Sequence, residues 1–230
     1  MSASIVNEIR YKPRRATMKL FLVRHGQTSW NKKKRYQGKT DIPLSSLGSW
    51  QAACIAKRLQ HEPIRKIYSS PLKRALSTAA PIAKFHKLTV DRCEELCERD
   101  YGGWEGLHKD QVIEKFPKDF GSYQKNRYSR RPTRGESILD LERKITPFAR
   151  KILTKSDAGG KGGRGLAIAI VAHNGSLRAL YRYLTDAPAK KVGGLAFKEA
   201  SVTCLTLKGR KVKINLFNSI SHLREHAPKK

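Results

Sequence analysis

The sequence predicts an α/β protein with a three-layer, doubly wound and mostly parallel sheet. Short, continuously apolar runs alternate along it with segments whose apolar residues recur at helical spacing. The clearest runs are Lys19–Val23, apolar after its first residue, and Leu166–Ala172. An uninterrupted apolar run is typical of a strand that is buried on both faces. The 230 residues suffice for one domain with a well-covered core.

The first half of the chain supplies three predicted strands and two predicted helices. The first strand leads into a polar, basic and turn-rich stretch, 28–43, which is expected to be a long loop over the site. Strands are expected again at 66–69 and 88–91. Ser70 and Pro71 predict a helix start, because a hydroxyl can cap the helix and proline fits its first position. The stripe that predicts the other helix consists of Gln51, Ala52, Ile55, Ala56 and Leu59.

The middle of the chain is less regular until one well-patterned helix begins. An irregular, glycine-rich region surrounds Trp104, and a short helix is expected over 110–116. Ser137 is the expected cap of the long helix, with Asp140 at its third position as in a capping box. Pro147 lies inside this pattern, which predicts a kink or a break there.

The last part of the chain completes the predicted sheet. The glycine-rich and basic stretch 156–165 is expected to be a flexible surface loop before the second long apolar strand. A helix is expected from about 176 to 184. Two antiparallel strands, at 201–207 and 211–217, are expected to close the domain through a turn at Gly209–Arg210.

The charge of the chain is extreme: 48 Lys and Arg stand against 19 Asp and Glu, a net charge of +29. Such an excess favours anionic partners, namely nucleic acid, an acidic membrane surface or phosphorylated metabolites. The alternative is a solvated basic surface without a second partner. No apolar run approaches the length of a transmembrane helix. The oligomeric state is not predicted.

The predicted domain covers residues 18–226, between a basic N-terminal extension, 1–17, and a short basic tail, 227–230. The extension fits an organellar presequence, a basic tail or an ordered segment, and Met18 would serve as an alternative start. The expected location is intracellular, in the cytoplasm, or in mitochondria or another organelle if the extension is a presequence.

The four cysteines do not predict a metal site. Cys54, Cys93, Cys97 and Cys204 form no Cys-x-x-Cys pair, and small buried hydrophobes in a reducing compartment are the preferred interpretation. Two imidazoles and a carboxylate elsewhere could ligate a metal, but neighbouring arginines oppose a divalent cation. No metal and no cofactor is therefore expected.

Two histidines occupy equivalent places, because His25 and His173 each follow the carboxyl end of a buried strand. That edge of an open α/β sheet is where ligands bind. If the two strands are neighbours, both rings point into one crevice. Arg24 precedes the first histidine, and Arg74 projects from the first turn of the helix after Ser70. This dense positive site is what a phosphoryl group requires.

The chain resembles the histidine phosphatase superfamily, in the branch of cofactor-dependent phosphoglycerate mutases and fructose-2,6-bisphosphatases. The resemblance runs from about Lys19 to Glu225 and implies a phosphoglycerate mutase-like fold. Its motifs are Leu-Val-Arg-His-Gly-Gln-Thr-x-Trp-Asn, ending at Asn31, and Tyr-Ser-Ser-Pro-Leu-Lys-Arg-Ala from Tyr68. Further matches are Gln37-Gly38, Asp41, Pro43-Leu44, Gly48, the segment Leu96–Gly102, Gly135-Glu136-Ser137, and Asn218 with His222-Leu223.

The resemblance implies a role for each matching residue. His25 would attack phosphorus and become phosphohistidine. Glu98 would protonate the leaving alkoxide and then deprotonate water. Arg24, Arg74 and His173 would hold the phosphoryl oxygens. The expected phosphate- or substrate-binding residues are Thr28, Asn31, Gln37, Gly38, Arg130, Arg131 and Asn174.

Some assignments have alternatives. Glu95, Glu105 or Asp100 could replace Glu98 as the proton donor. Tyr101 and Trp104 are interpreted as loop-packing aromatics rather than substrate contacts. The family usually has glycine directly after its second histidine, whereas this chain has His173-Asn174-Gly175. Asparagine tolerates unusual backbone angles, so the turn can survive.

The favoured activity is that of a phosphatase acting on a small, multiply anionic phosphate ester such as a sugar bisphosphate. Arg127, Arg130, Arg131 and Arg134 would suit a second anionic group, and a solvated basic loop is the alternative for them. Phosphoglycerate mutase-type transfer is the alternative within the enzyme class. In another class, the chain is a protein that binds RNA, a ribonucleoprotein or an anionic surface with a phosphatase fold.

Overall fold

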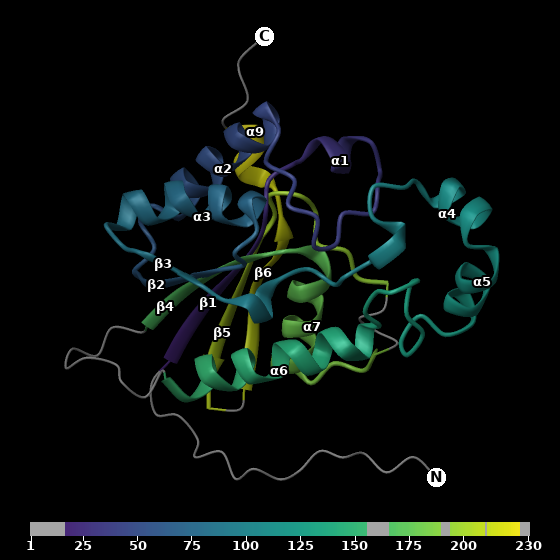
Figure 1. Cartoon of the computed structure of the whole chain (residues 1–230). Coiled ribbons are helices and arrows are strands. Elements are labelled where there is room, and N and C mark those ends of the chain that lie inside the picture. Colours follow the sequence, from purple (N-terminus) through teal and green to yellow (C-terminus); the bar gives the residue numbers. More distant parts are fainter. Residues whose placement is uncertain (1–16, 156–165, 190–193, 210, 226–230) are drawn as a thin grey trace.

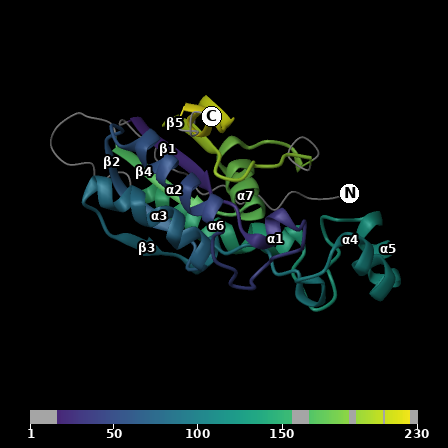
Figure 2. The same ribbon diagram turned by 90° about the horizontal axis from the view of Figure 1, so that it is seen from above.

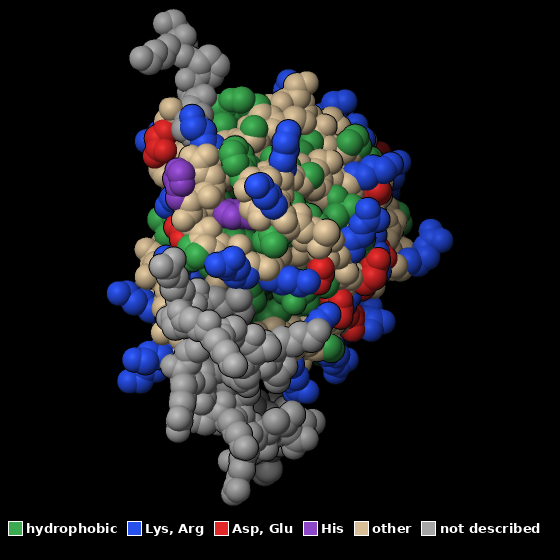
Figure 3. Space-filling model, turned by 90° about the vertical axis from the view of Figure 1, so that its left-hand side faces the viewer, with side chains coloured by type: hydrophobic (Ala, Val, Ile, Leu, Met, Phe, Trp, Pro, Cys, Tyr) green, Lys and Arg blue, Asp and Glu red, His purple; other side chains and the backbone are tan. Residues whose placement is uncertain are grey.

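The computed structural model describes residues 17–155, 166–189, 194–209 and 211–225. The predicted extension, apart from Thr17, the predicted loop 156–165, Arg210 of the predicted turn and the tail 227–230 lie outside these residues. Within the described part, no helix is both long and apolar enough to cross a membrane. Lys and Arg side chains project across the face drawn in Figure 3, among few Asp and Glu.

A six-stranded sheet in the order β3-β2-β4-β1-β5-β6 forms the middle layer (Figure 1). Strands β3, β2, β4 and β1 are mutually parallel, and β5 and β6 continue the sheet antiparallel. The predicted mostly parallel sheet is therefore confirmed. The strands are β1 (Thr17–Arg24), β2 (Ile64–Ser69), β3 (Val90–Arg92), β4 (Leu166–Ala172), β5 (Val202–Lys208) and β6 (Lys211–Ser219).

Helices cover both faces of the sheet, which gives the predicted three layers (Figures 1 and 2). Leu20 and Leu22 of β1 face the core beneath α6 (Ile138–Lys155) and α7 (Asn174–Thr185). Phe21 and Val23 face the opposite core, beneath α2 (Ser46–Leu59) and α3 (Lys73–His86). Successive strand residues point to opposite faces, so the apolar run predicted for this strand is buried on both sides. The short helix α9 (Ser221–Glu225) packs beside α2.

Two helices begin at other residues than the sequence predicts. Helix α3 starts at Lys73, and its N-cap Leu72 makes no side-chain cap. The hydroxyl of Ser70 instead accepts the backbone N–H of Leu72 and lies against His173, because the chain turns toward the sheet edge before the helix begins. Helix α7 starts directly after His173, at Asn174 rather than at residue 176.

The long helix α6 begins as predicted. The hydroxyl of Ser137 accepts the backbone N–H of Asp140, whose carboxylate accepts the backbone N–H of Ser137, so the capping box is confirmed. Pro147 does not break the helix, which runs on to Lys155. Its neighbours Ile145 and Phe148 are fully buried, and the packing of this face offsets the roughly 3 kcal/mol that an interior proline costs.

An outlying subregion lies beyond the strand ends, at the right of Figure 1. It contains the short 3₁₀ segment η2 (Gly102–Trp104) and the helices α4 (Lys109–Lys115) and α5 (Pro117–Lys125). The 3₁₀ segment η1 (Glu94–Leu96) instead packs against α6, and its Leu96 lies in the core beneath α6 and α7. Fully buried Trp104 is the centre of its small core, so its interpretation as a packing residue is confirmed. The predicted loop 28–43 is interrupted by the helix α1 (Ser29–Lys32), and α5 was not predicted.

Candidate active site

The two histidines meet because β1 and β4 are adjacent and parallel. Arg24 is in register with Ala172, and the backbone N–H of His25 donates to the Ala172 carbonyl. The centroids of the His25 and His173 rings lie 5.0 Å apart. The prediction that strands distant in sequence bring both imidazoles together is confirmed.

The environment of His25 fixes where its proton lies. Nδ1 is 2.7 Å from the carbonyl oxygen of Gly26. A carbonyl can only accept a hydrogen bond, so Nδ1 carries the proton and the lone pair of the neutral ring is on Nε2. Gly26 itself is required for packing: a Cβ at this position would lie 2.4 Å from the backbone oxygen of Gly48. Two backbones therefore approach each other closely behind the nucleophile candidate.

A cavity of about 150 Å³ opens beside His25 and collects most of the predicted residues. Among the residues of the described chain that line it, Glu98 is the acid, facing three arginines. The lining consists of Arg24, His25, Asn31, Arg35, Tyr36, Gln37, Gly38, Arg74, Glu98, Tyr101 and Asn174. The excess of positive charge fits a phosphoryl group.

Backbone carbonyls orient the two predicted arginines, of which Arg74 is fully buried and Arg24 is half-buried. Arg24 donates from Nη1 to the oxygen of Phe197 at 2.6 Å, while its buried Nε has no partner among the described residues. Arg74 donates to the carbonyls of Gly38 and Thr40 and, through Nε, to Nδ1 of His173 at 3.2 Å. A guanidinium has five N–H donors, so Arg74 retains donors for a ligand. A buried N–H donor without a partner lowers the stability of the folded protein. An anion bound in the cavity would accept from such a donor and remove this penalty.

Backbone amides hold Glu98 at the cavity wall. One carboxylate oxygen accepts the N–H of Arg99 at 2.8 Å, and the other accepts the N–H of Gly175 at 2.9 Å. Burial leaves the Glu98 side chain little room to swing away. Two of the alternative proton donors have other partners. Glu105 accepts the backbone N–H groups of Lys39 and Tyr101. Asp100 accepts the backbone N–H of Gly102. None of the alternatives is in the described lining of the cavity.

Asn174 stands where the family usually has glycine, and this difference has a structural consequence. The side-chain oxygen of Asn174 accepts the backbone N–H of Phe197 at 2.9 Å, which ties α7 to the segment before β5. Gly175 then faces Glu98 so closely that a Cβ would lie 2.2 Å from its carboxylate oxygen. The glycine is therefore needed one position later than the family pattern suggests.

We expect Gly175→Ala to lower kcat roughly a hundredfold, because the methyl group would displace Glu98, and a shift of about 1 Å at a catalytic group can cost this much. Gly121→Ala, at a position of α5 where a Cβ would meet nothing within 4 Å, serves as the matched control. Steady-state kinetics and the melting temperature of both variants check the prediction. A Gly175→Ala protein with unchanged kcat would contradict this account of Glu98.

Thr28 lies behind the cavity, where it supports Asn31 and Gln37. Its hydroxyl accepts the backbone N–H of Asn31 at 3.1 Å, and the Asn31 side-chain oxygen accepts the backbone N–H of Thr28. The same hydroxyl is 2.9 Å from Oε1 of Gln37. Thr28 is fully buried and caps α1. It orients residues of the cavity lining rather than lining the cavity itself.

His173 also lies beneath the cavity, and both of its ring nitrogens have protein partners. Nδ1 accepts from Nε of Arg74, and Nε2 lies 2.8 Å from the hydroxyl of Ser70. The side chain is fully buried. In this arrangement His173 contacts the phosphate-binding candidate Arg74 directly, and His25 across the 5.0 Å between the rings.

Burial lowers the pKa of both histidines well below 6.5, and the positive charges of Arg24 and Arg74 act in the same direction. The neutral form of His25, which carries the lone pair on Nε2, is therefore the form present near neutral pH.

The same shifts predict acid sensitivity of the fold. An unfolded histidine titrates near 6.5, so as the pH falls below this value the unfolded state binds more protons than the folded one. Stability is thus fully present above pH 6.5 and declines below it, by up to about 1.4 kcal/mol per pH unit for each buried histidine. Urea unfolding between pH 7 and 5 measures the slope. His173→Gln should flatten it, and exposed His61→Gln should not.

Two predicted residues lie apart from the cavity. Arg131 is exposed and forms an ion pair with Asp140, with 2.7 Å between Nε and Oδ2. Arg130 is exposed and lines a separate hollow of about 420 Å³ with Ser129 and Asn126. Neither arginine belongs to the lining described above.

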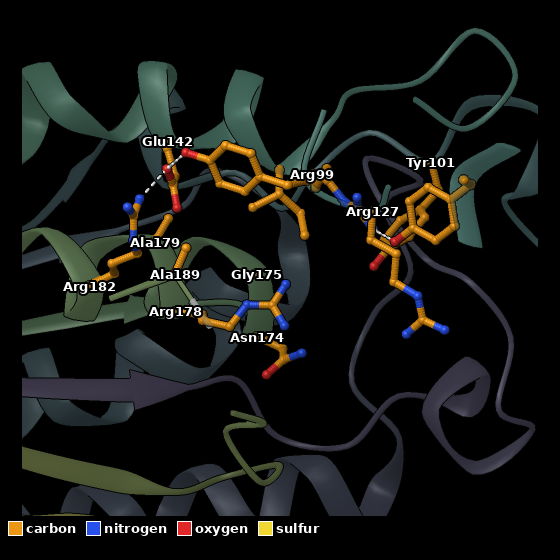
Figure 4. A pocket seen from close by; sticks show the side chains of 13 residues that line it. Arg99, Tyr101, Arg127, Glu142, Asn174, Gly175, Arg178, Ala179, Arg182 and Ala189 are labelled. Carbon is orange, nitrogen blue, oxygen red and sulfur yellow. Dashed lines mark hydrogen bonds and ion pairs between the residues drawn. The ribbon is translucent and has the colours of Figure 1, made fainter. Parts of the chain in front are cut away.

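A second, larger cavity of about 460 Å³ shares Tyr101 and Asn174 with the first. It lies between α6, α7 and the end of α5, and Figure 4 shows its arginines around an open centre. Its charged lining residues are Arg99, Arg127, Arg178, Arg182 and Glu142. Sequence reasoning missed Arg178, because the helix was expected to begin at about 176. In the structure α7 begins at Asn174, and the spacing of four residues puts Asn174 and Arg178 on one helix face.

Aromatic residues join the two cavities. The rings of Tyr36 and Tyr101 lie 5.0 Å apart, and Arg99 stacks 4.4 Å above Tyr101. The interpretation of Tyr101 as a packing residue is thus incomplete, because the ring both packs in the outlying subregion and lines both cavities. Arg35 and Tyr36 were not predicted either. They lie in the basic stretch that was expected to be a loop.

Comparisons with known proteins show the family of the chain. The family model of the histidine phosphatase superfamily (branch 1) matches residues 20–220. Phosphoserine phosphatase 1 of Hydrogenobacter thermophilus is 32% identical over 90% of this chain and 95% of its own length. Phosphoglycerate mutase-like protein 4 of Arabidopsis thaliana is 34% identical over 90% and 87%.

Further similarity extends to a mutase and to a solved structure. A 2,3-bisphosphoglycerate-dependent phosphoglycerate mutase of Methylobacterium sp. is 34% identical over 76% of this chain and 85% of its own length. A mycobacterial glucosyl-3-phosphoglycerate phosphatase, solved with VO3, matches with a TM-score of 0.78 at 28% identity, over 87% of this chain and 99% of that one. The fold is thus phosphoglycerate mutase-like. The chain belongs to branch 1 of the histidine phosphatase superfamily and is an enzyme of its phosphatase and mutase type.

Proposed function

We propose that the chain is a phosphomonoesterase that acts through a phosphohistidine on His25. One observation carries the proposal: the ring holds its proton on Nδ1, toward Gly26, which leaves the Nε2 lone pair beside a cavity lined by arginines. Nε2 attacks phosphorus, and the bond from phosphorus to the ester oxygen breaks. Arg24 and Arg74 stabilise the charge on the phosphoryl oxygens during transfer.

Glu98 moves the protons in both half-reactions. In the first, its carboxylic acid gives a proton to the departing ester oxygen, so the alcohol leaves neutral. In the second, its carboxylate takes a proton from water as the water oxygen attacks phosphorus. The bond between phosphorus and Nε2 then breaks, and inorganic phosphate and neutral His25 result. The two backbone N–H donors of Arg99 and Gly175 keep the carboxylate in place for both steps.

The experiment that tests the function is incubation with a panel of phosphorylated metabolites, followed by separate assays of inorganic phosphate and of isomerised product. Release of phosphate with a stoichiometric alcohol supports the phosphatase. Conversion of 3-phosphoglycerate to its isomer without free phosphate would support the mutase instead, which the relatives named as mutases keep as the second candidate. The two differ only in whether water or a second hydroxyl accepts the phosphoryl group.

The substrate has a second anionic group, held in the larger cavity. Four arginines and one glutamate supply its charged lining, and the glutamate is paired with Arg182. Nη1 of Arg99 and Nε of Arg182 are buried there without a partner in the described chain. These donors and the guanidinium of Arg178, which extends toward the centre of the cavity (Figure 4), are where a carboxylate or second phosphate would bind, rather than Arg130 and Arg131. A sugar bisphosphate would place its reacting phosphate in the smaller cavity and its second phosphate in the larger one.

We expect Arg178→Ala to raise the KM for fructose 1,6-bisphosphate roughly ten- to a hundredfold, the cost of about 1.5 to 3 kcal/mol for a lost charged hydrogen bond. The KM for p-nitrophenyl phosphate, which has no second anion, should change less than twofold. Arg58→Ala, which removes an exposed arginine from α2 on the opposite face of the sheet, is the matched control. A larger effect of Arg131→Ala than of Arg178→Ala would contradict the assignment.

Binding of RNA or another polyanion stays a prediction, since it depends on the net charge alone.

A further inference from the structure

The second histidine belongs to a chain of hydrogen bonds that runs away from the cavity. It contains the hydroxyl of Ser70 and the thiol of Cys97, groups that the proposed reaction does not use. Ser70 and His173 are fully buried, and Cys97 is 6% exposed. The distances are 2.8 Å from His173 Nε2 to Ser70 Oγ and 3.7 Å from Ser70 Oγ to Cys97 Sγ.

The direction of each hydrogen bond follows from its first member. The Nε of Arg74 always carries a hydrogen, so its contact with His173 requires a lone pair on Nδ1. Burial, the charge of Arg74 and the neighbouring His25 and Arg24 keep the pKa of His173 well below 6.5, and the ring is neutral. The single ring proton is then on Nε2, which donates to Ser70.

The hydroxyl of Ser70 is fully used by this arrangement. It accepts from His173 Nε2 and from the backbone N–H of Leu72 at 3.3 Å, and its own hydrogen points to Cys97 Sγ. Burial raises the pKa of the Cys97 thiol to about 11, so the thiol keeps its hydrogen. It lies 3.4 Å from Oε2 of Glu94, where the chain ends. Each hydroxyl and thiol therefore donates once, outward from the histidine.

The two facing imidazoles are consequently held in opposite tautomers. His25 carries its proton on Nδ1, toward the carbonyl of Gly26, and His173 carries its proton on Nε2, toward Ser70. The tautomer of His173 matters because the opposite one would direct an N–H at the guanidinium of Arg74. Two donors would then face each other in a buried site, and the arginine would keep only its contacts with the Gly38 and Thr40 carbonyls.

We propose that Ser70 is a positioning residue: by accepting the Nε2 proton of His173 it stabilises, together with the Arg74 donor on Nδ1, the tautomer in which the ring orients Arg74 toward the substrate phosphate. The role of Arg74 in this statement depends on the proposed function, but the tautomer does not. Ser70 does not touch the reacting atoms. It acts through His173, as a carboxylate acts through histidine in a catalytic triad.

The test combines nuclear magnetic resonance with kinetics. Two-bond nitrogen–proton couplings of the imidazole rings report the tautomer of each histidine in the full chain without substrate. We expect wild-type His173 to show a protonated Nε2 and an unprotonated Nδ1, and His25 to show the reverse. Ser70→Ala should give a mixture of tautomers at His173 and leave His25 unchanged. It should also lower kcat/KM for p-nitrophenyl phosphate roughly ten- to a hundredfold.

Ser201→Ala is the matched control, because this serine is also fully buried and its hydroxyl has no partner in the described chain. It should keep both tautomers and the activity. A protonated Nδ1 in wild-type His173 would overturn the inference, as would a Ser70→Ala protein with one unchanged tautomer and full activity. If Ser70→Ala fails to fold, the wild-type couplings still decide the tautomer. Cys97→Ala, which removes the acceptor of the Ser70 hydroxyl, then replaces it in the kinetic comparison, with a smaller loss expected.

A protein without phosphatase activity would leave the tautomer measurement intact, so failure of the proposed function and failure of this inference are distinguishable.

Discussion

Replacing His25 by alanine should reduce phosphate release about 10⁴-fold or more, because no other group among the described residues of the cavity lining supplies an equivalent lone pair next to the arginines. The loss should fall on kcat, while inorganic phosphate still binds through Arg24 and Arg74. Activity assays with p-nitrophenyl phosphate and calorimetric titration with inorganic phosphate measure the two effects separately.

The control for this prediction is His25→Gln, which keeps more of the buried volume beside His173. Both variants should be equally inactive, since neither side chain can form a phosphohistidine. Exposed His61→Ala should retain full activity. A His25 variant that still turns over substrate at a tenth of the wild-type rate would be incompatible with covalent transfer to this residue.

Glu98→Gln should slow turnover roughly 10²- to 10⁴-fold, the usual range for the loss of a general acid and base. The loss should depend on the leaving group. An alkyl phosphate needs a proton on its ester oxygen, whereas p-nitrophenolate leaves without one. The first step therefore suffers less with p-nitrophenyl phosphate, and the phosphoenzyme accumulates because the second step still lacks its base. Rates with both ester types and the fraction of labelled protein measure this.

The matched control is Glu114→Gln, which neutralises an exposed glutamate of α4 outside the cavity lining. It should behave as wild type with both esters. Glu105→Gln tests the alternative donor, and because Glu105 binds backbone amides of the loop above the cavity, any loss should be equal for the two ester types. A leaving-group dependence found with Glu105→Gln but not with Glu98→Gln would identify Glu105 as the general acid in place of Glu98.

The sheet and the centre of the site were predictable because they depend on local patterns. An apolar run such as Leu166–Ala172 has few places in a fold other than a strand covered on both faces. A polar residue directly after such a run lies at the sheet edge, whatever the intervening chain does. The meeting of His25 and His173 therefore required only that the two strands be neighbours, a condition that the sequence left open and that the pairing of β1 with β4 meets.

The outlying subregion and the arginines of the larger cavity were harder to predict from the sequence. Helix α5 has a polar sequence and is anchored through Phe120 and Tyr123 on Trp104, contacts that exist only after folding. Which arginine of the stretch around Arg130 reaches a cavity depends on the path of the loop. The pairing of Arg131 with Asp140 likewise requires the observed approach of that loop to α6. Helical spacing from Asn174 would have identified Arg178 only with the helix start placed at Asn174, where the structure has it.

The central claim is a covalent bond between phosphorus and Nε2 of His25, and rapid-quench trapping tests it most directly. Glu98→Gln protein is mixed with p-nitrophenyl [³²P]phosphate, quenched in alkali and digested, and the labelled peptide is identified. We expect label that is stable to alkali and lost in acid, on the peptide that contains His25. Steady turnover with no label on protein, or label on His173 or on a serine, would contradict the account.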